Sequence, residues 1–452
     1  MHQTALRLTA TAAFTSWVHA GTPAPTPPPP EIETPQRKVF AWEVQERARW
    51  EIKDNVFDFN DSLDSINDDN WLLNRFRLGF TLKPTDWFTF YAQGQDSREW
   101  FSDRPDTPGA FGAEGNDAFD LRQAYAEFSN YAKSPWGLRI GRQTLAYGDQ
   151  RLIGPLEWTN LARSFDAVRL TYKGDDWSVD AFTSSVVKPE RSEFNESDFT
   201  NDDITDRDQI FSGAYFSTTK LEFQTTDLYA LHLHENASDG DTDFVTLGTR
   251  WKSKAERFGP WDYDAEFAFQ TGEVGSRDLT AFASHLGGGY SVPGGGLWKS
   301  RFGLEYNFAS GDGDPLDGDI ETFQNLFPTN HIYYGFIDAF AWQNIHNVAL
   351  TWKASPCKNV TTRLDFHAFW LADTNDSWYR ANGTTTVRPL NAAARGADNF
   401  AGTELDFVVT WQAHKHVALE AGYSRFFAGN YLSDTGASDD ANFGYVQTTI
   451  TF

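Results

Sequence analysis

The chain has 452 residues, a formal charge of −25 and a single cysteine, Cys357. This charge argues against nucleic acid as a partner, because binding to phosphates requires a basic surface, and one cysteine excludes an intramolecular disulfide framework. Aromatic residues make up 16% of the chain although its mean hydropathy is −0.52. This combination is typical of a membrane β-barrel, in which alternate residues face lipid and water.

The N-terminal segment indicates export. Arg7 precedes an apolar stretch that ends in a small-residue cleavage pattern at Ala20, which predicts a secretory signal peptide over residues 1–20. The stretch is too short for a membrane-spanning helix. A Pro-rich segment follows, and we expect residues 21–38 to form a stiff periplasmic spacer. Because no second linker appears, residues 39–452 are expected to form one barrel.

Patterns with a period of two recur from residue 39 to the last residue. In segment 40–52 the even positions are largely apolar, whereas the odd positions from 43 to 51 are polar or charged. A helix would require apolar residues at a spacing of three to four. The same alternation returns in segments 76–82, 263–269, 302–308, 360–370, 405–411 and 417–423. With weaker segments included, we predict an all-β, transmembrane, antiparallel up-and-down barrel of about 18 strands.

The connections between these segments alternate in length. Short turns are expected at 83–86, 173–176, 354–359 and 413–416. Longer links, several of them strongly acidic, are expected at 53–70, 97–119, 144–164, 184–208, 310–342, 372–402 and 428–442. Outer-membrane barrels have short periplasmic turns and long extracellular loops. Most of the negative charge is therefore expected on the solvated rims.

The last segment, 445–452, has a strand pattern and ends in an aromatic residue, Phe452. This ending is typical of the closing strand of an outer-membrane barrel. We therefore expect the chain in the outer membrane of a Gram-negative-type bacterium, in contact with its lipid. A monomer is expected, because a closed barrel needs no partner strand.

Residues 119–172 carry a family resemblance. They contain the motifs FDLRQAYAEF, LRIGRQ, YGDQRLIGPLEW and, after Arg163, SFDAVRL, and SGDGDPLDG with LFPTNHIYYG follows later in the chain. These motifs resemble those of the alginate export porin family. The resemblance implies an 18-stranded barrel through which a polyuronate crosses the outer membrane at an arginine-rich constriction. One departure is the short turn 413–416, where the best-known form of the family has a longer turn that obstructs the pore.

Arginines are the candidate solute-binding residues of the lumen. An outward arginine at mid-membrane would cost about 2 to 4 kcal/mol, and stretch 139–169 is locally positive. The planar guanidinium group binds carboxylates with two hydrogen bonds, and rings of such groups select anions. The candidates are Arg47, Arg49, Arg75, Arg77, Arg122, Arg139, Arg142, Arg151, Arg163 and Arg169. The open alternative is that they only brace the lumen by pairing with supporting carboxylates, which are Glu127, Asp149 and Asp166.

Other chemistry is weakly indicated. The acidic loop with Asp312, Asp314, Asp317 and Asp319 has the oxygen ligands that calcium prefers, but Leu316 breaks the EF-hand spacing, and a solvated turn is the alternative. His232 and His234 share a strand face without a carboxylate nearby in the sequence, so a rim or lumen position is expected. No cofactor or catalytic motif is predicted. The expected function is a channel for an anionic polysaccharide or oligosaccharide; the alternatives are a porin for other solutes and, less favoured, a barrel-based enzyme or adhesin.

Overall fold

The fold is known from a computed structural model, which describes residues 39–62, 68–104, 115–190, 193–199, 209–236, 240–388, 390 and 395–452. The expected signal peptide and spacer, residues 1–20 and 21–38, lie outside the described residues. No described helix has the length and apolar character needed to cross a membrane.

Nineteen strands of the described chain form one sheet. The two-residue strand β14 pairs in parallel with β12, whereas β13 and β15 on either side of it pair directly. The wall therefore has eighteen strands, as expected. The strands are β1 (Phe40–Asp54), β2 (Asp69–Thr85), β3 (Phe88–Trp100), β4 (Asp117–Ser129), β5 (Trp136–Gln143), β6 (Phe165–Lys173), β7 (Trp177–Val186), β8 (Gln209–Thr218), β9 (Gln224–Glu235), β10 (Thr242–Ser253), β11 (Trp261–Val274), β12 (Arg277–Ser291), β13 (Arg301–Ala309), β14 (Asp319–Ile320), β15 (Ile345–Cys357), β16 (Val360–Leu371), β17 (Phe400–His414), β18 (Val417–Ala428) and β19 (Ala441–Thr451).

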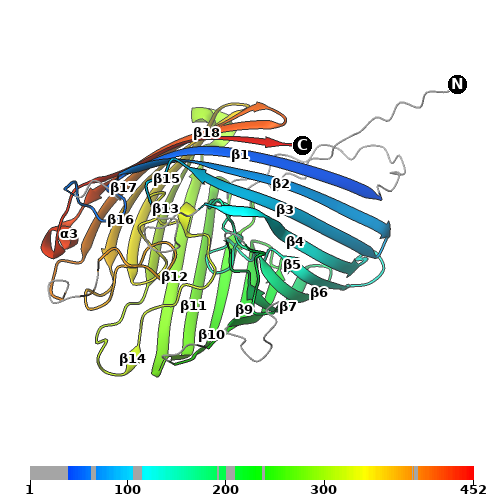
Figure 1. Ribbon diagram of the computed structural model, residues 1–452, viewed down its shortest axis with the longest axis horizontal. Coiled ribbons are helices and arrows are strands. Elements are labelled where there is room, and N and C mark those ends of the chain that lie inside the picture. The colour runs from blue at the N-terminus through cyan, green and yellow to red at the C-terminus, as the bar shows by residue number, and fades with distance from the viewer. Residues whose placement is uncertain are drawn as a thin grey trace.

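The sheet closes between the first and last strands. Strand β1 is antiparallel to both β2 and β19, so no strand of the wall has a free edge. The final residue takes part in this closure: the Phe452 N–H donates to the Val44 carbonyl at 2.9 Å, and the Val44 N–H donates to the Phe452 carbonyl at 3.2 Å. In Figure 1 the strands follow one another around the wall in order of colour, until the red chain end lies beside blue β1.

Alternation along the strands gives the wall two faces. On β2, Leu78 and Phe80 are about 40% exposed, whereas Arg75 and Arg77, which precede them on the strand at odd-numbered positions, are almost completely buried. The exposed apolar side chains face outward, where burial in lipid stabilises them. The arginines face inward. The period-two interpretation of the sequence is thus confirmed, and the fold is the predicted all-β barrel.

The two ends of the barrel differ as expected. Short turns and Phe40 lie at one end, and most of the longer links lie at the other. Two exceptions occur: β11 and β12 are joined by a short turn at the long-loop end, and the short-turn end carries η1 (Pro293–Gly295) and α2 (Gly296–Lys299). A girdle of exposed tryptophans surrounds the short-turn end, as at a membrane interface, and includes Trp87, Trp136, Trp177, Trp261 and Trp298.

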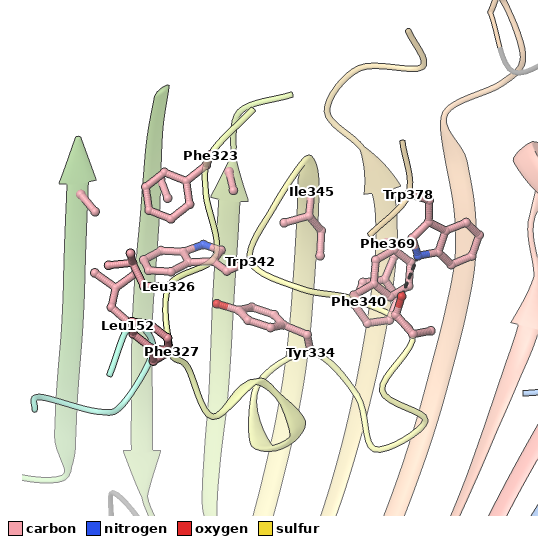
Figure 2. Close-up of a cluster of buried hydrophobic side chains, with 14 of the residues drawn as sticks. Leu152, Phe323, Leu326, Phe327, Tyr334, Phe340, Trp342, Ile345, Phe369 and Trp378 are labelled. Carbon is pink, nitrogen blue, oxygen red and sulfur yellow. Dashed lines mark hydrogen bonds between the residues drawn. The ribbon is translucent and has the colours of Figure 1, made fainter. Parts of the chain in front are cut away.

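The apolar core lies inside the barrel. The link between β13 and β15, which contains η2 (Asn330–Ile332), folds inward and packs on the inner faces of the strands. Figure 2 shows Phe340 against Phe369 of β16 and Trp378, with ring centroids 4.0 and 4.7 Å from Phe340. The Trp378 Nε1–H donates to the Ala339 carbonyl at 2.8 Å. This link was expected to be polar and exposed, and that expectation is wrong for its second half. Helix α3 (Asn430–Thr435) belongs to the last link at the same end.

Cys357 gives a test of orientation. It is exposed at the end of β15, at the short-turn end. A 5 kDa maleimide polymer, which is too large for the outer membrane, should leave Cys357 unlabelled in intact cells and label it once that membrane is permeabilised. In the Cys357→Ser background, Ser433→Cys on exposed α3 should be labelled in intact cells. The reverse pattern would place the long loops in the periplasm.

Candidate functional site

Five inward-facing arginines gather on the inner wall of neighbouring strands. Arg47 and Arg49 lie on β1, Arg75 and Arg77 on β2, and Arg122 on β4, where a register shift against β3 turns it inward. Each is between 1% and 8% exposed. Arg47 and Arg75 are direct cross-strand neighbours. Like charges placed opposite one another destabilise a sheet, so this arginine cluster requires compensating groups.

The compensating groups come from the link between β5 and β6. Residues 156–162 of this link, here called the tongue, project from the barrel interior onto the arginine cluster. The Arg163 N–H donates to the Pro155 carbonyl at 2.7 Å, so the two ends of the tongue meet. Leu156 (φ 49°) and Ala162 (φ 60°) have left-handed backbone conformations at the ends of the tongue. Such conformations in residues other than glycine cost about 1 kcal/mol or more and often mark functional loops.

Backbone carbonyls of the tongue accept hydrogen bonds from the arginines. Arg47 Nη1 donates to the Glu157 carbonyl at 2.8 Å, and Arg75 Nη1 donates to the same oxygen at 3.0 Å. Both arginines also donate to the Thr159 carbonyl at 3.1 Å. Arg49 Nη1 donates to the carbonyl of Trp158 at 2.7 Å. Carbonyl oxygens carry only partial charge, so these bonds satisfy donors without neutralising the guanidinium groups.

One carboxylate of the tongue, Glu157, is shared by three arginines. Its Oε2 lies 2.7 Å from Arg77 Nη1 and 3.3 Å from Arg75 Nη2, and its Oε1 accepts from Arg122 Nη2. Burial alone would raise the pKa of Glu157, but the charges of Arg122, Arg77 and Arg75 outweigh it and hold the pKa well below its ordinary value. Glu157 therefore stays ionised at any physiological pH.

The tongue is anchored independently of Glu157. The Asn160 side-chain amide donates to the carbonyls of Asn74 and Arg98 on the wall, at 3.0 and 3.1 Å. The Trp158 ring is stacked between two partners: the Arg49 guanidinium lies 3.7 Å from its centroid, and the His331 ring centroid lies 3.8 Å away. His331 belongs to the second inward link, so the two links support each other across the lumen.

The arginine cluster keeps a positive excess. Its five guanidinium groups face two carboxylates, Glu157 and Glu51, of which Glu51 pairs with Arg49 at 2.6 Å. Buried N–H donors of four arginines, Arg47, Arg75, Arg77 and Arg122, find no acceptor among the described residues. Each of these four arginines can thus donate a further hydrogen bond to an anionic oxygen, and the excess of positive charge favours anions.

The far wall of the lumen has a different charge pattern. There, Arg250 pairs with Asp227 at 2.7 Å and with Asp149 at 2.8 Å. Glu305 on β13 is a further carboxylate, and Asp365 on β16 and Glu404 on β17 lie between this wall and β1. The positive excess is thus concentrated on β1, β2 and β4, which gives a solute carboxylate one preferred side of the lumen.

Two more of the predicted arginines face the lumen but lie outside the cluster. Arg139 on β5 donates through Nε to Glu127 at 2.9 Å and lies 4.3 Å from the Tyr125 ring centroid. Arg169 on β6 lies 4.0 Å from Asp180 of β7. Both lie nearer the short-turn end, where solute leaving or entering the cluster would pass them. Glu127 is thus the ion-pair partner of Arg139.

Arg142 and Asp166 do not line the lumen, which corrects the prediction. They are paired across β5 and β6, with 3.0 Å between Arg142 Nε and Asp166 Oδ1. Phe165 belongs to the interior core, so its neighbour Asp166 faces outward, where the Ser197 hydroxyl donates to it at 2.7 Å. The physical reason is spacing: Arg142 is three residues from inward-facing Arg139, and an odd spacing reverses the face of a strand.

Arg151 and Arg163 brace the inward links. Arg151 Nη2 lies 2.9 Å from His285 Nε2, and its guanidinium lies 3.9 Å from the Tyr333 ring centroid. Arg163 Nη1 donates to the carbonyls of Gly154 and Pro328 at 3.1 and 3.0 Å. For these two, the bracing alternative describes the contacts. Asp149 supports Arg250 and Lys252 instead of a predicted arginine, and these cations, against the effect of burial, lower its pKa.

The acidic loop and the histidine pair form no metal centre. Among the described residues, no three His, Cys, Asp or Glu side chains are placed to hold a metal ion. Asp312, Asp314 and Asp317 each accept the N–H of the residue two positions later, as in Asx turns. Asp314, Asp317 and Asp319 are exposed, whereas Asp312 is buried and lies 3.7 Å from Arg277. The expectation that His232 and His234 lack a carboxylate is wrong, because both lie 2.9 Å from Asp243 of β10, on the outer rim.

The tongue residues were missing from the predicted site. Glu157, Trp158 and Asn160 lie in a link that the sequence places at the rim, where it was expected to be polar. A signal was present: Leu152, Ile153, Leu156, Trp158 and Leu161 make this link too apolar for a solvated loop. Gln93 and Gln95, which donate to or accept from the cluster and the tongue, gave no signal beyond their inward position.

Comparison with known proteins agrees with this geometry. The family model described as alginate export matches residues 39–446. Among curated proteins, no sequence relative is found.

Solved structures with a similar fold come from Pseudomonas aeruginosa. The chain matches OccK11 (OpdR) with a TM-score of 0.60 at 12% identity, covering 91% of this chain and 96% of that one. It matches OpdQ with a TM-score of 0.60 at 14% identity, covering 91% and 98%. It matches OpdK with vanillate with a TM-score of 0.58 at 11% identity, covering 91% and 99%. At these identities the likeness is one of fold, and it agrees with an outer-membrane channel.

Proposed function

The chain belongs to the alginate export family, and from this premise we propose that it conducts an anionic polysaccharide or oligosaccharide, such as an alginate-like polyuronate, across the outer membrane. The solute carboxylates meet the arginine cluster of β1, β2 and β4 as they pass through the lumen. The observation that supports this proposal is the cluster itself: five buried guanidinium groups share two carboxylates, and four of them have an N–H donor without an acceptor among the described residues.

The arrangement suits a solute with repeated carboxylates. Planar guanidinium groups bind a carboxylate through two parallel hydrogen bonds, and a polyuronate presents such a group on each sugar. Arg139 and Arg169, nearer the short-turn end, offer a second positive position along the same path. A polymer that exchanges carboxylates between successive positions is held at each one weakly enough to move on.

The second candidate is a channel for small carboxylates. One of the similar folds is a structure of OpdK with vanillate, which is a monocarboxylate with an aromatic ring. Such a solute would use the same arginine cluster but would need no second positive position.

The test is reconstitution of the purified protein in planar bilayers. In a KCl gradient we expect a reversal potential that shows anion preference, and we expect oligouronates to block the current at concentrations where a neutral oligosaccharide of equal length does not. Block by vanillate alone would favour the second candidate. Cation preference, or equal block by charged and neutral oligosaccharides, would contradict both.

A further inference from the structure

Glu157 is the only acidic side chain of the tongue, and it occupies the centre of the arginine cluster. Its two oxygens contact Arg75, Arg77 and Arg122 together, from two strands that are separated by β3 in the wall. A solute carboxylate bound to the same three guanidinium groups would make the same contacts. From this geometry we infer that Glu157 is a tethered competitor, which occupies the solute-carboxylate position until a solute displaces its side chain.

The inference rests on the proposed function, and exposure supports it. The Glu157 side chain is 22% exposed, whereas the side chains of Arg75, Arg77 and Arg122 are 4 to 7% exposed. Among the four side chains that share these contacts, that of Glu157 is therefore the most accessible to an incoming solute. Displacement exchanges one charge-assisted hydrogen-bonded pair for another, so it needs no bare guanidinium group at any stage.

The tongue does not need the Glu157 carboxylate to stay in place. Asn160 and Trp158 hold it to the wall and to the second inward link, and the Glu157 backbone carbonyl is bound by Arg47 and Arg75. The side chain can rotate away while this backbone remains fixed. The carboxylate is thus not needed to hold the tongue. It compensates the charges of Arg75, Arg77 and Arg122, which is what a bound solute carboxylate would also do.

Competition also tunes affinity. With Glu157 in place, the binding free energy of a solute carboxylate is only the difference between its own interaction with the arginines and the Glu157 interaction that it replaces. The solute then leaves readily, as conduction requires. An unoccupied cluster would bind a polyanion tightly and retain it.

The test compares the wild type with Glu157→Gln in planar bilayers, with the oligouronate concentration that halves the current as the readout. Removing the competing charge should lower this concentration about fivefold, given the strength of one charge pair at this distance. It should also increase anion preference in a KCl gradient. The matched control is Glu127→Gln, which removes a lumen carboxylate paired with Arg139, outside the cluster. Its effect on block should be smaller.

The outcomes separate the inference from the proposed function. If the wild type has no anion preference and no uronate-specific block, the proposed function fails and the inference fails with it. If the wild type behaves as proposed but Glu157→Gln is blocked at the same or a higher concentration, only the inference is overturned. Folding is checked by heat-dependent migration on gels. Should Glu157→Gln misfold, Glu157→Asp, whose carboxylate reaches less far, should shift block in the same direction by a smaller factor, and an unchanged value there overturns the inference.

Discussion

Excision of residues 156–162 and closure with two glycines is expected to raise the single-channel conductance several-fold. These residues are the tongue, which covers the arginine cluster from inside the barrel through its backbone carbonyls and Glu157. Because the Arg163 N–H already bonds to the Pro155 carbonyl at 2.7 Å, two glycines can close the gap without moving the flanking link. The measurement is conductance in planar bilayers at fixed salt.

The control is a smaller replacement by two glycines outside the lumen. Residues 315–318 lie in the exposed acidic turn, where Leu316 is 79% exposed, and their replacement by two glycines should leave conductance unchanged. Both variants should still migrate as folded barrels, because the wall keeps all its strand pairings, although excision of the tongue removes the Trp158–His331 stacking contact. An unchanged conductance after excision of the tongue would mean that the ion path does not pass the arginine cluster.

The fold could be predicted because each strand of a barrel wall has its own alternation of apolar and polar residues. In β1 the inward set of Arg47, Arg49 and Glu51 and the outward Ile52 follow from alternation alone, since each residue sees either lipid or lumen. Closure followed from the number of such segments and from the aromatic end of the chain. The strand number and the long-loop end were therefore predictable without any knowledge of register.

The partners of the arginines could not be predicted in this way. Alternation assigns a face but not a neighbour. Arg142 was expected in the lumen because stretch 139–169 is locally positive, although alternation counted from Arg139 places it on the outward face. Arg122 does face the lumen, but strict alternation along β4 would not place it there. The register shift between Gln93 and Gly94 of β3 interrupts the alternation at this point. Shifts of this kind depend on the pairing of two strands, which a single segment does not encode.

The direction of the long links was also beyond local patterns. Length and polarity predict that a link lies at the rim. The Glu157 carbonyl nevertheless accepts a hydrogen bond from the guanidinium of Arg47, which lies 110 positions earlier in the chain. Burial of Phe340 inside the barrel similarly depends on Phe369 of β16 and Phe426 of β18, which come later in the chain. The amino-acid composition of these links did indicate that they fold inward, because a link with this many aromatic residues cannot remain solvated.

Neutralising two arginines of the cluster, in Arg75→Gln with Arg77→Gln, is expected to cause the largest loss of anion preference. At the distances found here one charge contributes about 1 kcal/mol to the energy of a passing anion, which corresponds to about fivefold in permeability ratio for each charge removed. The measurement is the reversal potential in a KCl gradient. Because these charges act partly through water, the difference from the wild type should shrink as ionic strength rises.

Two controls decide whether the position or the charge of these arginines matters. Arg98→Gln removes an exposed arginine that pairs with Asp96 on the outer face, and Arg142→Gln with Asp166→Asn removes the buried outward pair. Neither should change the reversal potential, although Arg142 has the same charge and a similar burial to Arg75. The pair variant leaves the net charge unchanged, so Arg98→Gln is the control for net charge. If Arg98→Gln reduced anion preference as much per charge removed as Arg75→Gln with Arg77→Gln, selectivity would arise from the net charge of the protein, and the arginine cluster would only brace the tongue.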